Sequence, residues 1–444
     1  MFSRPFVALA IAIFGATMGL GMVVPVLPLY ARDLGATGAE IGLTYSTFAA
    51  TQLVVSPFAG RLADRFGRRP FLIGGLLAYA AAALGWYLTN SIEATLALRA
   101  LSGVGAGLLF SVAFAYVGEL APRGQEGRYM GTFGLFDFLG FGVGPLVGGV
   151  VRDTWGLDAV FLSMAALMAG GAVAIAVLLP VRPRTSTPSA LRDVGTAIER
   201  RHSASSGAAS GSRVEEETPL ATTRCVRPIA WRVVLRDRQI QALFAAGASF
   251  SLAFGTAFPF AAIYLEDEIG ASATLIGITF AAQELTGGAL QPATGWLADR
   301  VSRRAMVVGG AALIAVGYVA TSLTTTYSVF LLAFAIGPGL GGAANRVATQ
   351  ALNVEVGRRV GLATAMGLAS ASFAFGILVG SLVGGVVVEL VGIAGALRAA
   401  AVASVLGALL FALRSGEPPR GSATPATNSP TDDGEPVVGQ PLET

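Results

Sequence analysis

The sequence contains no lysine, one cysteine and one histidine among its 444 residues. A single cysteine, Cys225, cannot form a disulfide within the chain. Together with His202 it lies in one polar stretch, where the two cannot supply a His/Cys metal site inside a membrane. A nucleotide-binding loop of the G-x-x-x-x-G-K-S/T type needs the missing lysine. No nucleophile–base pair is present either, so we expect no metal, no other cofactor and no enzyme activity.

Charged side chains are also scarce. They make up 13% of the residues, whereas an ordinary soluble domain carries roughly 25%. Hydrophobic residues reach 54% and the mean hydropathy is +0.67, so most of the surface must face lipid. The pI near 9.2 does not indicate nucleic acid as a partner, because the arginines lie in short clusters between apolar runs.

Apolar runs of about 20 residues, the length that crosses a bilayer core of ~30 Å, recur along the chain. The first run is too long for the core of a cleavable signal peptide, which has ~7–15 residues. The twelve predicted spans are 6–30, 40–60, 70–90, 93–117, 128–150, 158–180, 239–265, 274–297, 305–325, 328–349, 360–388 and 393–413. The sequence therefore predicts an all-α membrane protein with twelve transmembrane helices.

Two polar regions divide this pattern. We expect six spans in 1–180, a linker at 181–238, six more spans in 239–414 and a disordered tail at 415–444. The linker carries 11 arginines and six acidic residues around a middle rich in Ser, Gly and Ala, which is typical of a flexible connection. Its residues 189–201 could form a short amphipathic helix on anionic lipid, and a regulatory role is left open.

The arginines of the connections fall unevenly on the two sides of the membrane. One side holds Arg61, Arg65, Arg68, Arg69, Arg123, Arg128, Arg300, Arg303, Arg304, Arg358 and Arg359. The other side holds Arg32 and Arg152 and an acidic run at 266–268. Because short arginine-rich loops stay in the cytoplasm, we expect both termini and the linker there, with the chain in the inner or plasma membrane of a prokaryote.

Three segments recur at an offset of 234 to 236 residues, at equivalent places in each half. The pairs are Gly60–Arg69 with Gly295–Arg304, Gly144–Val151 with Gly380–Val387, and Pro25–Tyr30 with Pro259–Tyr264. Such self-similarity indicates that the two halves share one fold. We therefore expect two pseudo-symmetric six-helix bundles, with a substrate site near the membrane midplane between them.

The segment Gly60–Arg69 reads G-R-L-A-D-R-F-G-R-R. It resembles the signature loop of the major facilitator superfamily, G-x-L-A-D-R-x-G-R-R, at every fixed position, and the second copy departs only at Ser302. With the twelve-span layout the resemblance covers about residues 5–414. It implies a secondary active transporter, expected as a monomer in membrane lipid, that moves a small-molecule substrate by alternating access.

The resemblance also implies that this loop takes part in gating. The residues concerned are Gly60, Asp64, Arg65, Gly67, Arg68, Arg69, Asp299 and Arg300. In the superfamily the matching aspartate braces the cytoplasmic side of the eleventh helix when the carrier is open outward. Asp64 would then meet the helix that starts near Val360, and Asp299 the one that starts near Arg128. The alternative is a topological anchor made of arginines, which does not require an aspartate.

Two further segments resemble elements of the superfamily. Arg99, followed by Ser102–Gly107, resembles the conserved element of the fourth helix. A guanidinium inside a span costs ~2.5–3.5 kcal/mol on insertion scales, so such residues are usually paired and functional, although Arg99 could also snorkel to the outer surface. The fifth-helix motif that marks antiporters is matched by Gly140, Gly144, Pro145, Gly148 and Gly149. Glycines at this spacing allow close helix packing, so packing alone is the alternative.

Two acidic residues lie well inside predicted spans, Asp137 in the fifth and Glu284 in the eighth. Their repeat equivalents are Phe373 and Ala49, and packing would be expected to respect the repeat, whereas substrate and proton chemistry can break it. Burial disfavours the charged form of a carboxyl group, so these acids could bind a proton and a solute alternately. Satisfied structural polar residues are the alternative.

Weaker candidates surround these acids. Gln283 could orient a solute beside Glu284; Gln52, Asn345 and Arg346 follow, and Arg346 could instead snorkel into the cytoplasm. Aromatic residues could line an apolar pocket or pack against lipid and core, namely Phe136, Phe138, Phe141, Phe254, Phe258 and Phe260.

The prediction is proton-coupled antiport, that is, multidrug-like efflux of small lipophilic or cationic solutes. The fifth-helix motif and the Pro25-x-x-Pro28-x-Tyr30 end of the first span resemble the drug:proton antiporter branch. One alternative is uptake or facilitated diffusion of a sugar or organic anion. Another is a non-transporting sensor or scaffold that works through the linker. Deleting most of 185–225 would separate the last from a transporter, which should stay active.

Overall fold

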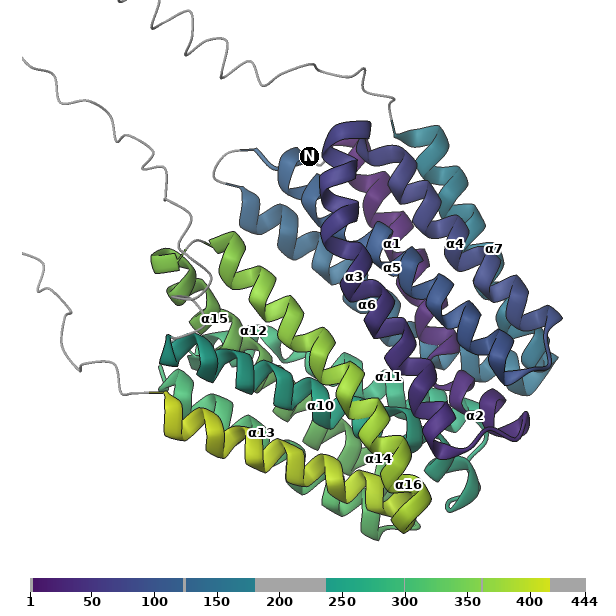
Figure 1. The fold of residues 1–444 in the computed structure, drawn as a ribbon, viewed down its shortest axis with the longest axis vertical. Helices are drawn as coiled ribbons and strands as arrows, with labels where there is room; N and C mark the ends of the chain where they lie inside the picture. Colours follow the sequence, from purple (N-terminus) through teal and green to yellow (C-terminus); the bar gives the residue numbers. More distant parts are fainter. Residues whose placement is uncertain (1–2, 123–124, 180–236, 299, 361, 416–444) are drawn as a thin grey trace, which may run out of the picture.

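The computed structural model describes residues 3–122, 125–179, 237–298, 300–360 and 362–415. Nearly all of the predicted linker and tail, including the amphipathic helix considered at 189–201, lies outside these residues. Every regular element in the described part of the chain is helical (Figure 1).

The first half of the chain forms one bundle, called the N-half. Its elements are α1 (Arg4–Val23) with α2 (Val26–Asp33), α3 (Gly38–Phe66), α4 (Arg68–Leu88), α5 (Ile92–Leu120), α6 (Glu126–Trp155) and α7 (Leu157–Leu178). Pro25 separates α1 from α2, since it has no N–H to donate within a helix. Thr37 and Glu40 form a capping box that begins α3. Gly67 ends the helix at φ +91°, a backbone conformation that glycine adopts readily and other residues rarely do.

The second half forms a matching bundle, called the C-half. Its elements are α10 (Arg238–Asp267), α11 (Ala273–Ala289) with α12 (Gln291–Ala298), α13 (Arg303–Leu323), α14 (Tyr327–Phe334) with the π-helical turn η1 (Ala335–Gly341) and α15 (Gly342–Val360), and α16 (Leu362–Arg414). Two spanning helices make up α16, because Gly392 breaks it at φ +79°.

Nine stretches of the described chain are long and apolar enough to cross a membrane. The last of them, Ala365–Arg414, holds two spans on either side of Gly392. The set of twelve is completed by α3, which carries charged residues near both ends, and by the α11–α12 pair, which is interrupted at Leu290. The predicted fold class and the order of the spans are confirmed, and most helices extend a few residues beyond the predicted ends.

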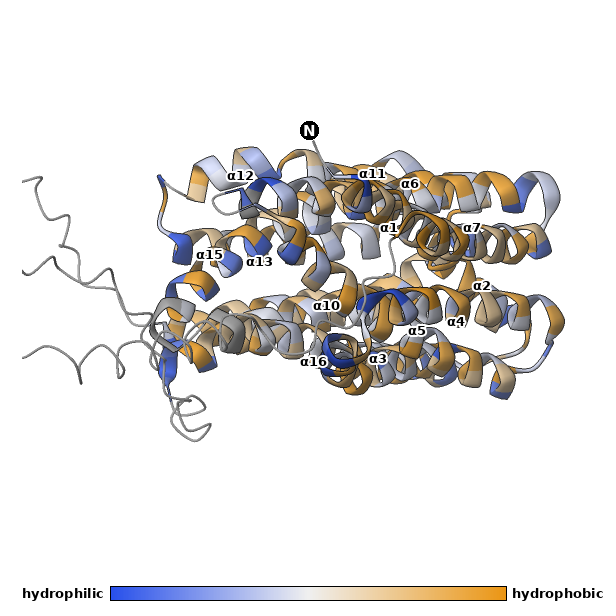
Figure 2. Cartoon of the chain, turned by 90° about the horizontal axis from the view of Figure 1, so that it is seen from above, coloured by the Kyte–Doolittle hydropathy of each residue, from blue (hydrophilic) through white to orange (hydrophobic). Residues whose placement is uncertain are grey.

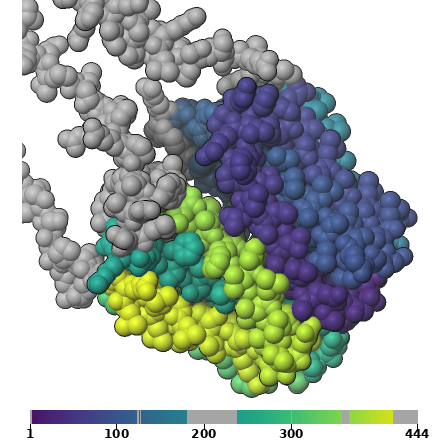
Figure 3. All heavy atoms as spheres, viewed as in Figure 1, coloured from purple at the N-terminus to yellow at the C-terminus, as the bar shows by residue number. Residues whose placement is uncertain are grey.

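The halves lie side by side, purple to blue and teal to yellow in Figures 1 and 3. One end of both bundles, called the acidic end, carries the connections at 34–37, 89–91, Gly156, 268–272, 324–326 and Gly392. The opposite end, called the arginine-rich end, carries those at Gly67, 121–125 and 300–302. Hydrophobic residues, orange in Figure 2, occur along all of the helices, as lipid contact requires.

The halves meet toward the acidic end and diverge toward the arginine-rich end (Figure 1). Where α3 packs on α16, the hydroxyl groups of Ser46 and Ser381 lie 2.7 Å apart. Where α6 packs on α11, a Cβ added to Gly149 would lie 2.2 Å from the carbonyl oxygen of Ala273. These two contacts between the halves, called the seams, are equivalent in the repeat, because α3 corresponds to α11 and α6 to the first part of α16. The pseudo-symmetry predicted from the sequence therefore also governs how the halves touch.

Candidate functional site

A pocket lies between the halves, near the middle of the helices. It is lined mostly by the C-half, with Phe138 of α6 from the N-half, and its space of about 310 Å³ includes the part that is open to solvent. The side chains that give it its chemistry are Phe138, Phe250, Phe254, Gln283, Glu284 and Arg346. With Gln291 of α12, three aromatic rings and four polar side chains therefore line one small space.

The irregular backbone of the tenth span shapes this pocket. The π-helical turn η1 contains Pro338, and such turns are rare and often occur at functional sites. Gly339 approaches α11 so closely that an added Cβ would lie 2.8 Å from the carbonyl oxygen of Gln283. Arg346 lies two helical turns further along α15 and lines the same pocket as Glu284.

Arg346 is held between two aromatic rings. Its guanidinium carbon lies 5.8 Å from the ring centre of Phe138 and 5.8 Å from that of Phe250, within the range of a cation–π interaction. The side chain is half-buried and lines the pocket. The alternative that Arg346 snorkels to the cytoplasmic surface is therefore not what the structure shows.

Asp137 of the N-half and Glu284 of the C-half lie within electrostatic reach of each other. Asp137 directly precedes the pocket residue Phe138, Glu284 lines the pocket, and both side chains are partly buried. The positive charge of Arg346 acts on both carboxyl groups, and the negative charge of Glu284 also acts on Asp137. Among the ion pairs found between described residues, none with N–O distances up to 4.0 Å joins these three side chains.

Gln283 lies beside Glu284 as predicted, and it is 5% exposed. Its amide nitrogen is 3.5 Å from the Glu284 carboxylate, at the limit of a hydrogen bond. Within the described part of the chain its amide oxygen has no hydrogen-bond partner. A buried acceptor left without a donor is unfavourable.

Other predicted candidates lie elsewhere. Asn345 points toward α13, where it donates to the Val307 carbonyl at 3.2 Å, and it lines a separate small pocket inside the C-half. Gln52 lies on α3 outside the pocket lining, and its carbonyl accepts a hydrogen bond from Ser56 at 2.7 Å. Neither residue is brought to the acids in this conformation.

The aromatic candidates divide into three pairs. Two of them, Phe138 and Phe254, line the pocket. Two others are buried in the core of the C-half, namely Phe258 and Phe260. The last two, Phe136 and Phe141, pack against the core of the N-half.

Arg99 lies inside the N-half and is 3% exposed, so it does not snorkel. Its guanidinium carbon lies over the rings of Tyr45 at 4.8 Å, Phe48 at 5.0 Å and Trp86 at 6.0 Å. Its Nε has no hydrogen-bond partner among the described residues. Aromatic faces, rather than a carboxylate, therefore stabilise this buried cation.

The loop between α3 and α4 turns at Gly67. Arg68 pairs with Asp64 at 3.0 Å and also with Glu119 of α5, and Arg69 donates to the Ala176 carbonyl of α7. These contacts stay within the N-half.

The other predicted gating residues surround this turn. Asp64 has a side chain that is 68% exposed, Arg65 lies over the ring of Phe66 at 5.4 Å, and Gly60 faces open space. In the second copy Arg300 stacks on Trp296 at 3.6 Å, whereas Asp299 lies outside the described residues. The side chain of Val360 is not described either, so the expected contact of Asp64 with the eleventh helix stays a prediction.

The fifth-helix motif packs on two sides. Gly140, Gly144 and Gly148 face α1, where an added Cβ at each would lie 2.1, 2.5 and 2.6 Å from its atoms. On the other side, Gly149 and the carbonyl of Pro145 meet α11 of the C-half. The motif therefore joins a seam inside the N-half to the seam between the halves.

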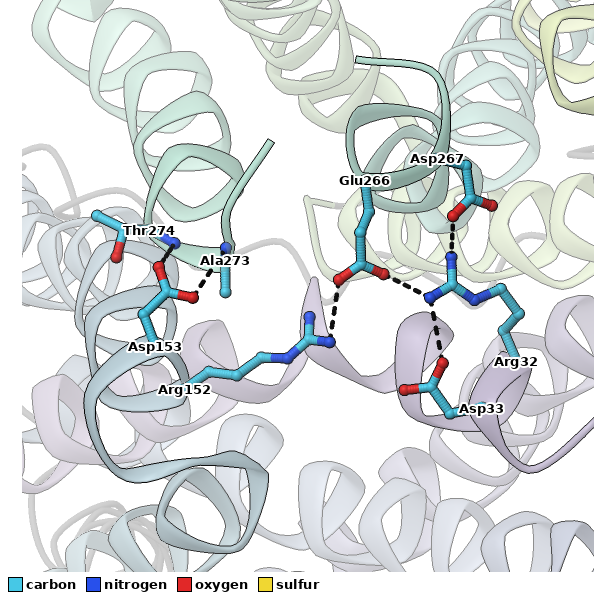
Figure 4. Close-up of polar contacts among 8 residues, drawn as sticks. All are labelled: Arg32, Asp33, Arg152, Asp153, Glu266, Asp267, Ala273 and Thr274. Carbon is cyan, nitrogen blue, oxygen red and sulfur yellow. Dashed lines mark hydrogen bonds and ion pairs between the residues drawn. The ribbon is translucent and has the colours of Figure 1, made fainter. Parts of the chain in front are cut away.

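Ion pairs close the acidic end across the halves (Figure 4). Arg32, at the end of α2, pairs with Glu266 at 2.5 Å and with Asp267, both at the end of α10. Arg152, at the end of α6, pairs with Glu266 at 3.0 Å. One carboxylate of the C-half thus holds two arginines of the N-half.

Asp153 adds a contact beside these pairs (Figure 4). Its carboxylate accepts hydrogen bonds from the backbone N–H groups of Ala273 at 3.2 Å and Thr274 at 2.7 Å, at the start of α11. A carboxylate is favoured at a helix N-terminus by unpaired N–H groups and by the helix dipole. The N-half therefore caps a helix of the C-half.

Sequence reasoning used Arg32, Arg152 and the acidic run 266–268 only to orient the chain, and it missed Asp153. The sequence did contain a signal for this cluster. Arg32 and Arg152 each follow the end of a predicted span, on the same side of the membrane as the acidic run 266–268.

Glu266→Arg is expected to open the acidic end. The change removes both ion pairs of Glu266 and adds a third positive charge beside Arg32 and Arg152. Partly exposed ion pairs contribute ~0.2–1 kcal/mol each. With the added repulsion we expect the closed arrangement to lose about 2 kcal/mol, which is roughly 30-fold in the ratio of closed to open molecules.

Spin labels on cysteines at Glu93 and Thr325, in a Cys225→Ser background, would report the distance across this end. Both sites are exposed and belong to different halves. Glu268→Arg reverses the charge of an exposed neighbour and serves as the control. A distance distribution in Glu266→Arg that matches this control would contradict the role given to the ion pairs.

The sequence profile of the Major Facilitator Superfamily matches residues 9–264 and 243–439. An uncharacterized MFS-type transporter of Methanocaldococcus jannaschii is 24% identical over 404 residues, which cover 91% of this chain and 96% of that protein. The quinolone resistance protein NorA of Staphylococcus aureus is 30% identical over 141 residues, but this match spans only 32% of this chain and 36% of NorA.

Solved structures agree on the fold. A POT family transporter in complex with 5-aminolevulinic acid superposes with a TM-score of 0.69 at 15% identity, covering 92% of this chain and 96% of that one. Another POT family structure, in complex with a thioalcohol-conjugated peptide, gives a TM-score of 0.68 at 15% identity and the same coverage. With its helices in two matching bundles and a profile match along nearly its whole length, the chain belongs to the Major Facilitator Superfamily and is a membrane transporter of small molecules.

Proposed function

We propose that this transporter exports small lipophilic or cationic solutes in exchange for protons. The observation that supports this is the pocket between the halves, where Glu284 lies among the rings of Phe138, Phe250 and Phe254, and where Asp137, directly before Phe138, is within electrostatic reach of Glu284. Aromatic faces attract cations and apolar surfaces, and a carboxylate adds the opposite charge. The pocket therefore suits a solute that is apolar in body and positively charged.

The acids also supply a means of coupling. A carboxylate in a largely apolar space is favoured only when a proton or a cation balances it. A cationic solute that binds thus displaces the proton, and a proton that binds releases the solute. Exchange follows when the pocket opens alternately to the two sides of the membrane.

The two states of this cycle use contacts at opposite ends. The described structure has its halves joined at the acidic end, by the seams and ion pairs given above (Figure 4). In the other state these contacts would part, and Asp64 would brace the eleventh helix at the arginine-rich end. We place the arginine-rich end and both termini in the cytoplasm of a monomeric plasma- or inner-membrane protein, on the strength of the loop arginines. The described state then faces inward.

A second candidate is uptake of a small anion or zwitterion. Arg346 in the pocket favours it, because a guanidinium pairs well with a carboxylate. The POT family structures, solved with a conjugated peptide and with 5-aminolevulinic acid, point the same way. The partial match to a quinolone resistance protein supports export instead.

Proteoliposomes with an imposed pH gradient and an interior pH dye would test the two. Lipophilic cations, neutral antibiotics, sugars, organic acids and short peptides are added in turn, with protein-free liposomes as the control. We expect lipophilic cations to dissipate the gradient. Dissipation by organic acids or peptides alone would favour the second candidate, and solute equilibration without proton movement would contradict proton coupling.

A further inference from the structure

One arginine, Arg346, lies near the two acidic residues of the site. The sum of these charges decides which charged solutes the pocket can bind. Arg346 lines it from α15 and Glu284 from α11, and Asp137 of α6, which directly precedes the lining residue Phe138, lies within electrostatic reach of both. Its lining residues from α10, α12 and η1 carry no charge. Tyr318 of α13 lies within electrostatic reach of Glu284, and a phenol, with a pKa near ~10 in water, is neutral at physiological pH.

With both acids ionised, these groups leave one negative charge. Arg346 offsets one carboxylate through its field, because it acts on both acids without forming an ion pair with either. Its guanidinium is instead held between the rings of Phe138 and Phe250, one from each half. Neither carboxyl group is therefore neutralised by a direct ion pair with Arg346.

We infer that Arg346 is a specificity-determining residue, which limits the pocket to solutes with one positive charge and exchanges each of them for one proton. The inference rests on the proposed proton-coupled export. An unbalanced charge is unfavourable in a space largely removed from water. One proton or one monovalent cation balances the pocket, whereas a divalent cation leaves a positive charge. Exchange then moves no net charge across the membrane.

Arg346→Gln should change this charge selectivity. Without the guanidinium the two acids can balance one divalent cation, or two protons. Ethidium and propidium are suitable probes, since they share a ring system and propidium carries a second positive charge on its side chain. We expect the wild type to exchange ethidium and exclude propidium, and Arg346→Gln to move propidium at least about tenfold faster than the wild type does.

A double variant tests the charge balance independently. Asp137→Asn alone leaves Arg346 to balance Glu284, so the pocket has no net charge and ethidium exchange should be lost. Adding Arg346→Gln restores one negative charge. The double variant should therefore recover ethidium exchange to within about threefold of the wild type, a coupling that two independent sites would not show.

Dye and proton movement would be followed in proteoliposomes, with the membrane potential set by potassium and valinomycin. Wild-type ethidium exchange should respond to the pH gradient and not to the potential. Arg346→Lys keeps the charge and should keep the exclusion of propidium.

Two results would overturn the inference while leaving the proposed export in place. They are ethidium exchange that follows the imposed potential in the wild type, and a double variant as inactive as Asp137→Asn. If neither dye moves protons in the wild type, the proposed function fails for these solutes and the inference falls with it.

Discussion

Solute-driven proton movement is expected to be lost in Glu284→Gln. Glutamine keeps the size of the side chain but cannot ionise, so Arg346 and Asp137 are left to balance each other. Truncating one partner of a buried charge pair, here the pair of Glu284 with a bound cationic solute, costs about 2–5 kcal/mol, and about 2 kcal/mol is already roughly 30-fold in solute affinity. Initial rates in proteoliposomes, at a fixed concentration of a solute that the wild type transports, would measure the loss.

Two matched variants make this result specific. Glu93→Gln is the same chemical change at an exposed acid outside the pocket, and it should transport like the wild type. Glu284→Asp keeps the charge on a shorter side chain and should retain part of the exchange. If Glu284→Gln transports normally, the acid is a structural polar residue and the coupling mechanism proposed here is wrong.

Gly149→Leu is expected to prevent closure of the acidic end and so to stop transport. A Cβ there would lie 2.2 Å from the carbonyl oxygen of Ala273 and 2.9 Å from the Cα of Thr274, so it meets backbone that cannot turn aside. Overpacking costs ~1–3 kcal/mol or more, and about 3 kcal/mol changes the ratio of closed to open molecules by roughly 100-fold. Transport rates and the distance between labels at Glu93 and Thr325 would show the effect.

Gly131→Leu is the control for this change. It adds the same side chain to the same helix at a position with open space around it, so both measurements should stay near the wild-type values. A Gly149→Leu variant with normal transport and an unchanged label distance would contradict the requirement for a close seam between α6 and α11.

Much of the fold could be predicted because a membrane-spanning helix satisfies its backbone hydrogen bonds within one segment and shows an apolar surface to lipid. Local composition therefore marks each span. The irregularities could not be read in this way. The π-helical turn η1 lies inside an apolar run, and its hydropathy does not distinguish it from a regular helix.

The candidate site was predicted in part. Asp137 and Glu284 break the repeat; the structure places Glu284 and Gln283 in the pocket lining, and Asp137 one residue before the lining residue Phe138, within electrostatic reach of Glu284. Asn345 was a candidate by type, but its amide is held by the Val307 carbonyl. The place of Arg346 between two rings depends on η1 and on the packing of both halves, so its sequence position alone did not reveal it.

By itself, the sequence determined that the chain spans the membrane twelve times, that its halves repeat, and which acids lie inside the spans. These properties depend on local composition and on spacing along the chain. Only the tertiary structure decided that Glu266 holds Arg32 and Arg152, which lie 234 and 114 residues away, and that the described halves meet at the acidic end. Such contacts arise from how packed helices are placed relative to one another, because no local property of either segment specifies its partner.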